Sequence, residues 1–400
     1  MFATNVGDAV RVPVSRRRSE FPQSRLTGKL AAHFADHSYD DPTVVIDLDI
    51  VEAQYRALAQ GLAPAHIHYA VKANPEPAIV RTLVREGSRF DAASRAELEL
   101  CLSEGAAPED LSFGNTVKRV RDIAWAHAQG IDLFAADAEE ELEKIAMHAP
   151  GARVYIRFLV EESQADWPLS RKFGAPAAQI IPLMDRAVAL GLRPVGISFH
   201  VGSQTREAMM WVGVLNEVAA VWHAAIAHGH DLSVLNIGGG FPAFYGDPIE
   251  APLSYGQTVM RLVRERFGDV PYVMAEPGRG LVAEAGVLEC EVLLVSRKRP
   301  DDIARWVYLS IGKFSGLAET IDEAIRYQFD TTADDGVNGP CILAGPSCDS
   351  ADVLYEQRPM QLPMGLRAGD KVHILCTGAY TTSYASVGFN GFPPLASVCI

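Results

Sequence analysis

The chain has 400 residues, of which 48% are hydrophobic and 22% charged, and its formal net charge is −14. This length exceeds the size at which one hydrophobic core usually stops growing, so a large domain and a smaller one are expected. The acidic balance argues against nucleic acid as a partner. No apolar run approaches the roughly 18 residues of a membrane-spanning helix, which predicts a cytoplasmic protein with no membrane partner.

Neither the N-terminal arginines nor the cysteines predict a special site. Arg16, Arg17 and Arg18 are not followed by an apolar stretch, so they are interpreted as a solvated surface and not as a signal peptide. The cysteines lack paired Cys-x-x-Cys or histidine spacing, so no disulfide framework and no metal site are predicted. They stand at Cys101, Cys290, Cys341, Cys348, Cys376 and Cys399.

From about residue 44 to residue 280 the sequence repeats a short β-branched or aromatic run, a break and an amphipathic stretch. This alternation is typical of βα units. After an opening run at 44–46, eight candidate strands each end on residues capable of chemistry, which is the strand count of a (β/α)8 barrel. A doubly wound sheet stays open on pattern alone, but it would not need polar residues at every strand end. These ends are Lys72, Asp91, Asn115, Asp137, Arg157, His200, the triplet Gly238, Gly239 and Gly240, and Glu276.

After residue 281 the sequence pattern changes to closely spaced β-like runs, such as those at 286–295, 306–309 and 371–375. The first 40 residues show no βα rhythm. The sequence therefore predicts an α/β fold with a TIM-type barrel over residues 41–280 and a β-rich domain built from residues 1–40 and 281–400.

Lys72 ends the first predicted strand, in the segment YAVKAN (residues 69–74). A lysine at the end of a buried strand loses solvation, which is expected to lower the pKa of its amine and to let it form a Schiff base with an aldehyde. Pyridoxal 5'-phosphate (PLP) is the obvious aldehyde. A lysine that snorkels from a strand end is the alternative that this segment leaves open.

Two glycine-rich strand ends predict a phosphate site. The triplet in NIGGGF (residues 236–241) can expose successive backbone N–H groups, although three glycines are as often a simple turn. Arg279, in AEPGRG (residues 275–280), and Ser203 add further donors. Glu276 could keep a pyridine nitrogen protonated, or it could form a salt bridge to Arg279.

Other polar residues at strand ends have both a functional and an ordinary interpretation. His200 could stack on a flat ring or be a core histidine. Asp91 and Glu97 are spaced to orient Lys72 or a neighbouring ring, although Glu97 is also a plausible surface residue. Arg157 lies within an apolar run (residues 154–160) and needs a buried partner such as a carboxylate.

Two turns of the predicted β-rich domain carry further candidates. Cys348 and Asp349 lie in the turn GPSCDS (residues 345–350), where the thiol could deliver a proton and the carboxylate could bind a cation or only form the turn. Tyr380 lies in a glycine-containing turn, where its phenol could donate to a phosphate or only pack.

Nine segments, in this order, resemble the ornithine decarboxylase family of PLP-dependent enzymes over nearly the whole chain. They are YAVKAN, RFDAASRAELE, SFGNTVK, LFAADAEEELEKI, SFHVGSQ, NIGGGFP, AEPGRGLV, GPSCDSADVLYE and GAYTTSYASVGFNGFPP. The resemblance implies a PLP-binding barrel, a β domain and a head-to-tail homodimer with active sites at the subunit interface.

The resemblance also implies roles for individual residues. Lys72 would form the Schiff base, Glu276 would pair with the pyridinium, and His200 would stack on the ring, with Asp91 and Arg157 as supports. The partner subunit would contribute Cys348, acting at the α-carbon, and Asp349, holding the distal ammonium of the substrate. The residues implied at the phosphate are Ser203, Gly239, Gly240, Gly278, Arg279 and Tyr380.

One departure from the family bears on the substrate. Family members often place an acidic residue just before a glycine as a second ligand for the distal amine, but this chain has Ser310 and Ile311 before Gly312. Asp349 remains, with Glu319 or Asp322 as further candidates. The resemblance therefore implies decarboxylation of a basic L-amino acid, most simply L-ornithine to putrescine and CO2, with lysine as the nearest alternative and diaminopimelate or a non-catalytic regulatory relative as remoter ones.

Overall fold

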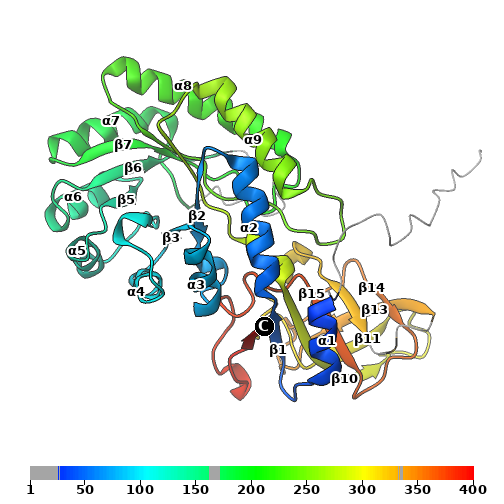
Figure 1. Ribbon diagram of the computed structural model, residues 1–400. Helices are drawn as coiled ribbons and strands as arrows, with labels where there is room; N and C mark the ends of the chain where they lie inside the picture. The colour runs from blue at the N-terminus through cyan, green and yellow to red at the C-terminus, as the bar shows by residue number, and fades with distance from the viewer. Residues whose placement is uncertain (1–25, 27, 162–171, 332, 334–336) are drawn as a thin grey trace, which may run out of the picture.

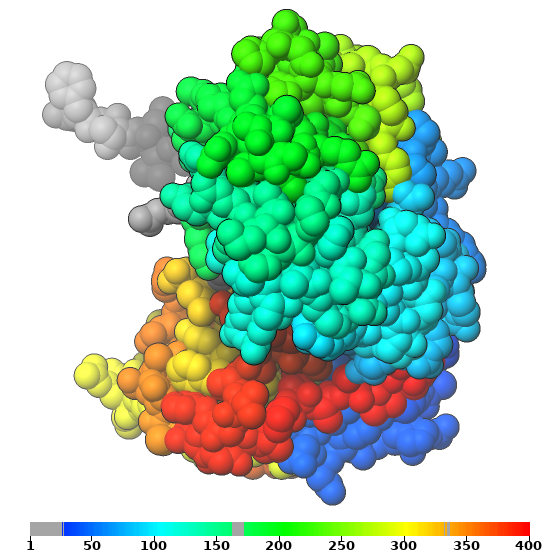
Figure 2. All heavy atoms as spheres, turned by 90° about the vertical axis from the view of Figure 1, so that its left-hand side faces the viewer, coloured from blue at the N-terminus to red at the C-terminus, as the bar shows by residue number. Residues whose placement is uncertain are grey.

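The computed structural model describes residues 26, 28–161, 172–331, 333 and 337–400, so the arginines at 16–18 lie outside it. The chain forms a closed barrel of eight parallel strands and a separate eight-stranded sheet (Figure 1). Both parts of the predicted fold class are confirmed. Figure 2 shows the barrel, cyan to green, stacked on the second domain, with a recess between the barrel and the red C-terminal segment.

All eight barrel strands fall where the polar strand ends predict them. They pair in sequence order, and β2 closes the barrel on β9 through His66 opposite Met274 and Ile67 opposite Ala275. The strands are β2 (His66–Ala70), β3 (Arg89–Ala92), β4 (Leu111–Phe113), β5 (Leu133–Ala136), β6 (Arg153–Arg157), β7 (Arg193–Ser198), β8 (Val234–Asn236) and β9 (Tyr272–Ala275).

The barrel helices form the outer ring. They are α2 (Leu48–Leu62), α3 (Pro77–Arg85), α4 (Arg95–Ser103), α5 (Val120–Ala128), α6 (Glu139–His148), α7 (Ala177–Ala189), α8 (Val212–His228), α9 (Pro252–Phe267) and the short α10 (Arg279–Val282). Two glycines allow α2 and α9 to touch backbone to backbone: a Cβ on Gly61 would lie 2.4 Å from the carbonyl oxygen of Leu253, and one on Gly256 would lie 2.8 Å from Gly61 itself. Larger residues would push these helices apart.

One helix of the described residues, Ala208–His228, is long and apolar enough to cross a membrane. No spanning helix is predicted from the sequence because interspersed polar residues break the apolar run of this segment. In the structure this segment is α8 with its preceding turn, and Val214, Leu215, Val218 and Trp222 are buried on its inner side. Its apolar side thus belongs to the protein core.

The second sheet has the strand order β12-β15-β10-β11-β13-β14, with β1 on β10 and β16 on β1. The helix α1 (Gly28–Asp36) packs on it, with Leu30 in one cluster with Val45, Val287 and Leu375. Residues 28–36 therefore pack against this domain. The strands are β1 (Thr43–Ile46), β10 (Gly286–Ser296), β11 (Arg305–Leu309), β12 (Gln328–Thr331), β13 (Asn338–Ala344), β14 (Met360–Pro363), β15 (Lys371–Leu375) and β16 (Ala396–Cys399).

Strand β1 shifts the domain boundary. The predicted barrel begins at residue 41, but β1 pairs with β10, Thr43 opposite Glu289, and with β16, so the first barrel element is α2. All four residues of β1 are buried. A short run that is buried on both sides carries no periodicity that would tell which sheet it joins.

Candidate active site

Lys72 lies in a single 3-10 turn (Val71–Ala73) that directly follows β2. Its Nζ is 3.9 Å from Oδ2 of Asp91, the last residue but one of β3; the Lys72 side chain is 47% exposed and that of Asp91 only 4%. Burial lowers the pKa of Lys72, but the neighbouring Asp91, Tyr380 and Glu276 outweigh it, and the net pKa is raised. The expectation of a lowered pKa is wrong because it counted desolvation and not the three acidic neighbours.

The lysine whose pKa is lowered is Lys118, which burial brings to about 8 in spite of its ion pair with Glu141. Its side chain is fully buried, and Nζ donates to the carbonyl oxygens of Asn115 and Ala135 while lying 3.0 Å from the carboxylate of Glu141. These three partners match the three donors of an ammonium group. Lys118 is therefore a structural lysine, whereas Lys72 is accessible.

Glu276 directly follows β9, and its carboxylate faces the same group of strand ends. Burial and then the charge of Asp91 raise the pKa of Glu276 to about 7, although Lys72 and a hydrogen bond from Asn236 oppose the shift. Asn236 Nδ2 donates to Oε1 of Glu276 over 2.5 Å, and its Oδ1 accepts from the backbone N–H of Gly238 at 2.9 Å. The sequence analysis gave Asn236 no role, although it ends β8 as the other candidates end their strands.

The glycine triplet forms a close-fitting cradle. Gly238 and Gly240 have φ of +69° and +111°, which only glycine adopts without strain. A Cβ on Gly239 would lie 3.0 Å from Nε2 of His200, and one on Gly240 would lie 2.7 Å from the carbonyl oxygen of Gly202. The backbone of the triplet is thus free of side chains on the side that faces His200.

His200 is held in its neutral form. Burial, and then the charges of Arg157 and Lys72, lower its pKa well below 6.5. Its Nδ1 accepts a hydrogen bond from the backbone N–H of Gly202 at 2.9 Å, so the ring proton sits on Nε2. A neutral ring with a fixed tautomer suits stacking on a flat partner.

Arg279 is buried, with 3% of its surface exposed, and all five of its N–H groups are engaged. Two donate to the carboxylate of Glu319, at 2.6 and 2.7 Å, and one to the hydroxyl of Tyr245. The other two donate to Ser203 Oγ, at 3.1 and 3.2 Å. Arg279 therefore pairs with Glu319 and not with Glu276, and Ser203 Oγ accepts two of its N–H groups.

The C-terminal segment reaches from the β domain to the Lys72 turn. The backbone N–H of Tyr380 donates to the carbonyl oxygen of Ala73 at 2.8 Å, and Ser383 Oγ donates to that of Lys72 at 3.0 Å. The guanidinium of Arg279 lies 5.0 Å above the Tyr380 ring, and a Cβ on Gly278 would come within 3.4 Å of the phenol oxygen. Tyr380 and Gly278 thus join the same cluster.

Two other strand-end residues, Arg157 and Asp137, and Glu97 of α4 contact the neighbouring loops. Arg157 shares a face of β6 with buried Tyr155, and its guanidinium lies 5.2 Å from the centre of the Phe173 ring. Its charge also acts on the buried carboxylates of Asp91 and Glu276, whose pKa values it lowers against the effect of burial, so carboxylates do lie near it as the sequence predicts. Asp137 accepts from the backbone N–H of Gly174 at 2.7 Å, and Glu97 accepts from that of Ala93 at 2.6 Å, which makes Glu97 a helix-capping residue of α4.

The turn with Cys348 and Asp349 lies on the surface of the chain, and both side chains are exposed. Its shape is fixed from below by buried Asp352, which accepts from the hydroxyl of Ser347 at 2.7 Å and from the backbone N–H of Lys313 at 2.7 Å. Oδ1 of Asp349 accepts only the local bond from Ala351 at 2.9 Å among the described contacts. The thiol and carboxylate therefore face outward from a rigid turn.

The structure also decides between the two spare acidic residues. Glu319 is buried in its ion pair with Arg279, so its carboxylate is not free to bind a distal amine. Asp322 is exposed and lines a different cavity of about 350 Å³ with Arg206, Asp247 and Arg326 among its other residues. Of the predicted ligands for an ammonium group, Asp349 and Asp322 therefore keep exposed carboxylates, and Glu319 does not.

The chain and its strand-end cluster match known proteins. Residues 48–283 match the family described as pyridoxal-dependent decarboxylase, pyridoxal binding domain. Ornithine decarboxylase 2 of Drosophila melanogaster is 32% identical over 384 residues, which cover 94% of this chain and 96% of the relative. Among solved structures, a mutant of lysine decarboxylase from Selenomonas ruminantium in complex with PLP is 31% identical with a TM-score of 0.84, covering 94% of this chain and 96% of that one. The arginine decarboxylase of Paramecium bursaria Chlorella virus bound to agmatine is 27% identical, also with a TM-score of 0.84, covering 93% and 99%.

The barrel and its cluster of lysine, carboxylates and glycine cradle define an enzyme of the PLP-binding barrel class. The chain belongs to the pyridoxal-dependent decarboxylase family, and it is a PLP-dependent carboxy-lyase.

The residues present fit the cofactor. The glycine cradle, in which a Cβ would collide, offers backbone N–H groups and the Ser203 hydroxyl to a phosphate dianion. Glu276 can face a ring nitrogen, His200 can face the ring, and accessible Lys72 can hold the aldehyde carbon.

Proposed function

We propose that the chain decarboxylates a basic L-amino acid, L-ornithine, to give putrescine and CO2. The observation that carries this proposal is the accessible Lys72 amine beside Asp91 and Glu276 at the mouth of the barrel. The named relatives, which decarboxylate ornithine, lysine or arginine, support a basic substrate.

When bound, PLP supplies an aldehyde for covalent attachment of an amine and an electron-withdrawing pyridinium ring. Lys72 would hold the cofactor through Nζ. Glu276, kept in place by Asn236, would accept a hydrogen bond from the protonated ring nitrogen and so favour the pyridinium form. His200 would pack on the ring, and the cradle would hold the phosphate.

The exposed turn would complete the site with groups that the barrel lacks. The thiol of Cys348 would return a proton to the α-carbon after CO2 has left, and the carboxylate of Asp349 would hold the distal ammonium of the substrate. Lysine is the second candidate substrate, because Ser310 and Ile311 offer no second charge to fix the distance to this ammonium. Diaminopimelate fits less well, since its distal carboxylate calls for arginine and the turn presents a carboxylate.

The substrate is tested by measuring CO2 release and the diamine product from ornithine, lysine, arginine and diaminopimelate with PLP-loaded protein. We expect the largest kcat/KM with ornithine and a smaller value with lysine. A clear preference for arginine or diaminopimelate would contradict the substrate proposal while leaving the decarboxylase chemistry intact.

We also propose a homodimer with shared active sites, because a thiol that faces outward from one subunit can reach the mouth of a partner's barrel. Random pairing of Lys72→Ala with Cys348→Ala subunits makes half of the dimers mixed, each with one intact site, so activity should return to about one quarter of wild type. Each variant alone, taken through the same exchange, is the control. Activity that stays at the parental level although exchange is shown independently would contradict shared sites.

A further inference from the structure

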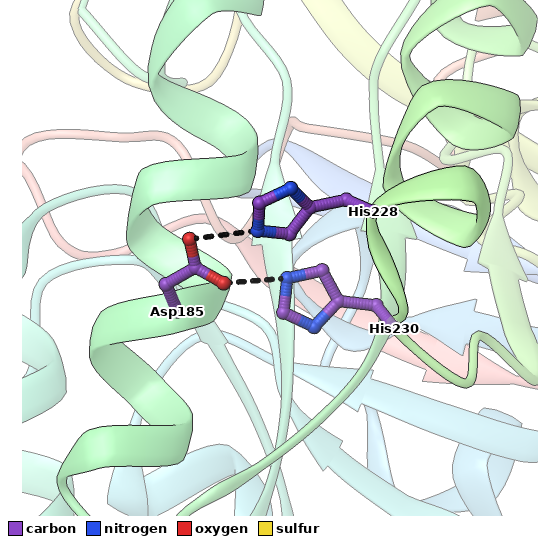
Figure 3. A group of neighbouring side chains, drawn as sticks. All are labelled: Asp185, His228 and His230. Carbon is purple, nitrogen blue, oxygen red and sulfur yellow. Dashed lines mark hydrogen bonds and ion pairs between the residues drawn. The ribbon is translucent and has the colours of Figure 1, made fainter.

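Two histidines and an aspartate converge on the outer surface of the barrel, away from the Lys72 cluster. Asp185 lies in α7, His228 is the last residue of α8, and His230 follows the cap Gly229, whose φ is +115°. Figure 3 shows both imidazole rings turned toward the two oxygens of one carboxylate. The three residues precede the starts of β7 and β8, so the cluster lies at the end of the barrel opposite to the active site.

The geometry within this His-Asp-His cluster is close. Nε2 of His228 is 3.1 Å from Oδ2 of Asp185, and Nε2 of His230 is 3.1 Å from Oδ1. The three ligand atoms all lie within 4.8 Å of one another.

The His230 side chain is only 8% exposed, and within the described part of the chain its Nε2 makes no well-aligned hydrogen bond, although Oδ1 of Asp185 is 3.1 Å away. A buried ring nitrogen that lies near a carboxylate but is poorly aligned for a hydrogen bond is an unsatisfied polar atom, and an imidazole nitrogen of this kind can coordinate a metal ion.

We propose that Asp185, His228 and His230 bind one divalent transition-metal ion of the zinc type. Two imidazoles with one carboxylate are the donor set of Zn²⁺, Ni²⁺ and Cu²⁺, whereas Mg²⁺ and Ca²⁺ prefer oxygen ligands alone. Ligand atoms about 2.1 Å from a tetrahedral ion are roughly 3.4 Å apart. The two nitrogen to oxygen spacings are 3.1 Å, each to a different oxygen of the carboxylate, and no spacing in the set exceeds 4.8 Å, so small side-chain movements would bring all three ligands to an ion. Asp185 and His228 are half exposed, so water can take the fourth position.

The ion would clamp the C-terminal turn of α7 to the end of α8. It would therefore raise the stability of this side of the barrel without touching the groups assigned to catalysis. The alternative is that the contacts of Asp185 with the two imidazoles hold the cluster together alone and no metal binds.

Titration of PLP-loaded protein with Zn²⁺ by calorimetry, and with Co²⁺ by visible absorption, separates these cases. The exposed thiol is removed in every sample by Cys348→Ser, so that it does not compete. We expect one ion per chain, an upward shift in thermal unfolding with Zn²⁺, and binding about 100-fold weaker or lost in His230→Ala and in Asp185→Asn. His223→Ala, which removes an exposed histidine from the same helix, should bind like the parent protein.

Absence of binding in the parent protein would overturn the proposal. So would binding that survives in both His230→Ala and Asp185→Asn, because the ion would then sit elsewhere. Asp185→Asn changes a half-exposed side chain without altering its size, so its loss of binding cannot be ascribed to a loss of fold.

Discussion

The ion pair between Arg279 and Glu319 allows a quantitative test of how the phosphate cradle is built. Glu319→Ala removes the acceptors of two of the five N–H groups of Arg279, whose side chain is only 3% exposed. Breaking one partner of a buried pair leaves the other charge buried and unpaired, which typically costs about 3–5 kcal/mol. We expect the free energy of unfolding of PLP-free protein to fall by about this amount.

The cofactor should restore part of this loss. In Glu319→Ala the freed N–H groups of Arg279 can bond to a phosphate in the cradle, so PLP should stabilise the variant more than it stabilises the wild type. Urea unfolding of PLP-free and PLP-loaded protein measures both quantities. Glu265→Ala, which breaks an exposed pair with Arg261, is the matched control and should cost at most about 1 kcal/mol.

The reasoning fails if Glu319→Ala is no more destabilising than Glu265→Ala. It also fails if Glu319→Ala raises the KM for ornithine at saturating PLP while stability is unchanged, because Glu319 would then be a substrate ligand and not the partner of Arg279.

Three further outcomes follow from the site. Gly239→Ala should weaken PLP binding about 10-fold or more, because its Cβ would lie 3.0 Å from His200 Nε2; a fluorescence titration with wild-type affinity would refute the cradle. The pKa of Glu276 is raised from 4.5 to about 7, so its bound proton stabilises the PLP-free fold at low pH, and roughly 3 kcal/mol should be lost as the pH rises from 4.5 through 7. Glu276→Gln should remove that part of the pH dependence, and an unchanged stability profile would argue against it. Asp349→Ala should raise the KM for ornithine by an amount worth about 2–5 kcal/mol, whereas unchanged kinetics would place the distal site elsewhere.

The barrel could be predicted because each of its strands is a buried run that ends on a polar residue, and this edge of a parallel sheet collects such residues. Strand β1 does not end on a polar residue of this kind, so the sheet that it joins could not be predicted from the sequence. The sequence also singles out Lys72 as a candidate amine because it stands at the first strand end, but it predicts a desolvated side chain, whereas 47% of the Lys72 side chain is exposed.

Contacts between residues about 40 positions apart could not be predicted from the sequence. The partners of Arg279 and Glu276 are Glu319 and Asn236, and both choices depend on how loops from different strands meet. The pKa of Lys72 also depends on how loops from different strands meet. Desolvation at a strand end can be predicted from the sequence, but only the folded structure shows that Asp91, Tyr380 and Glu276 surround the amine.

The identity of the lysine that holds PLP is the central claim, and Lys118 is its competitor. Lys118 has the lowered pKa of a reactive amine, about 8, but its donors are filled and its side chain is fully buried. Borohydride reduction of PLP-loaded protein, followed by peptide mass mapping, shows which lysine is modified. The account predicts the cofactor mass on the peptide with Lys72 and no PLP bound covalently in Lys72→Ala. Cofactor mass on the peptide with Lys118, or wild-type decarboxylation by Lys72→Ala, would contradict it.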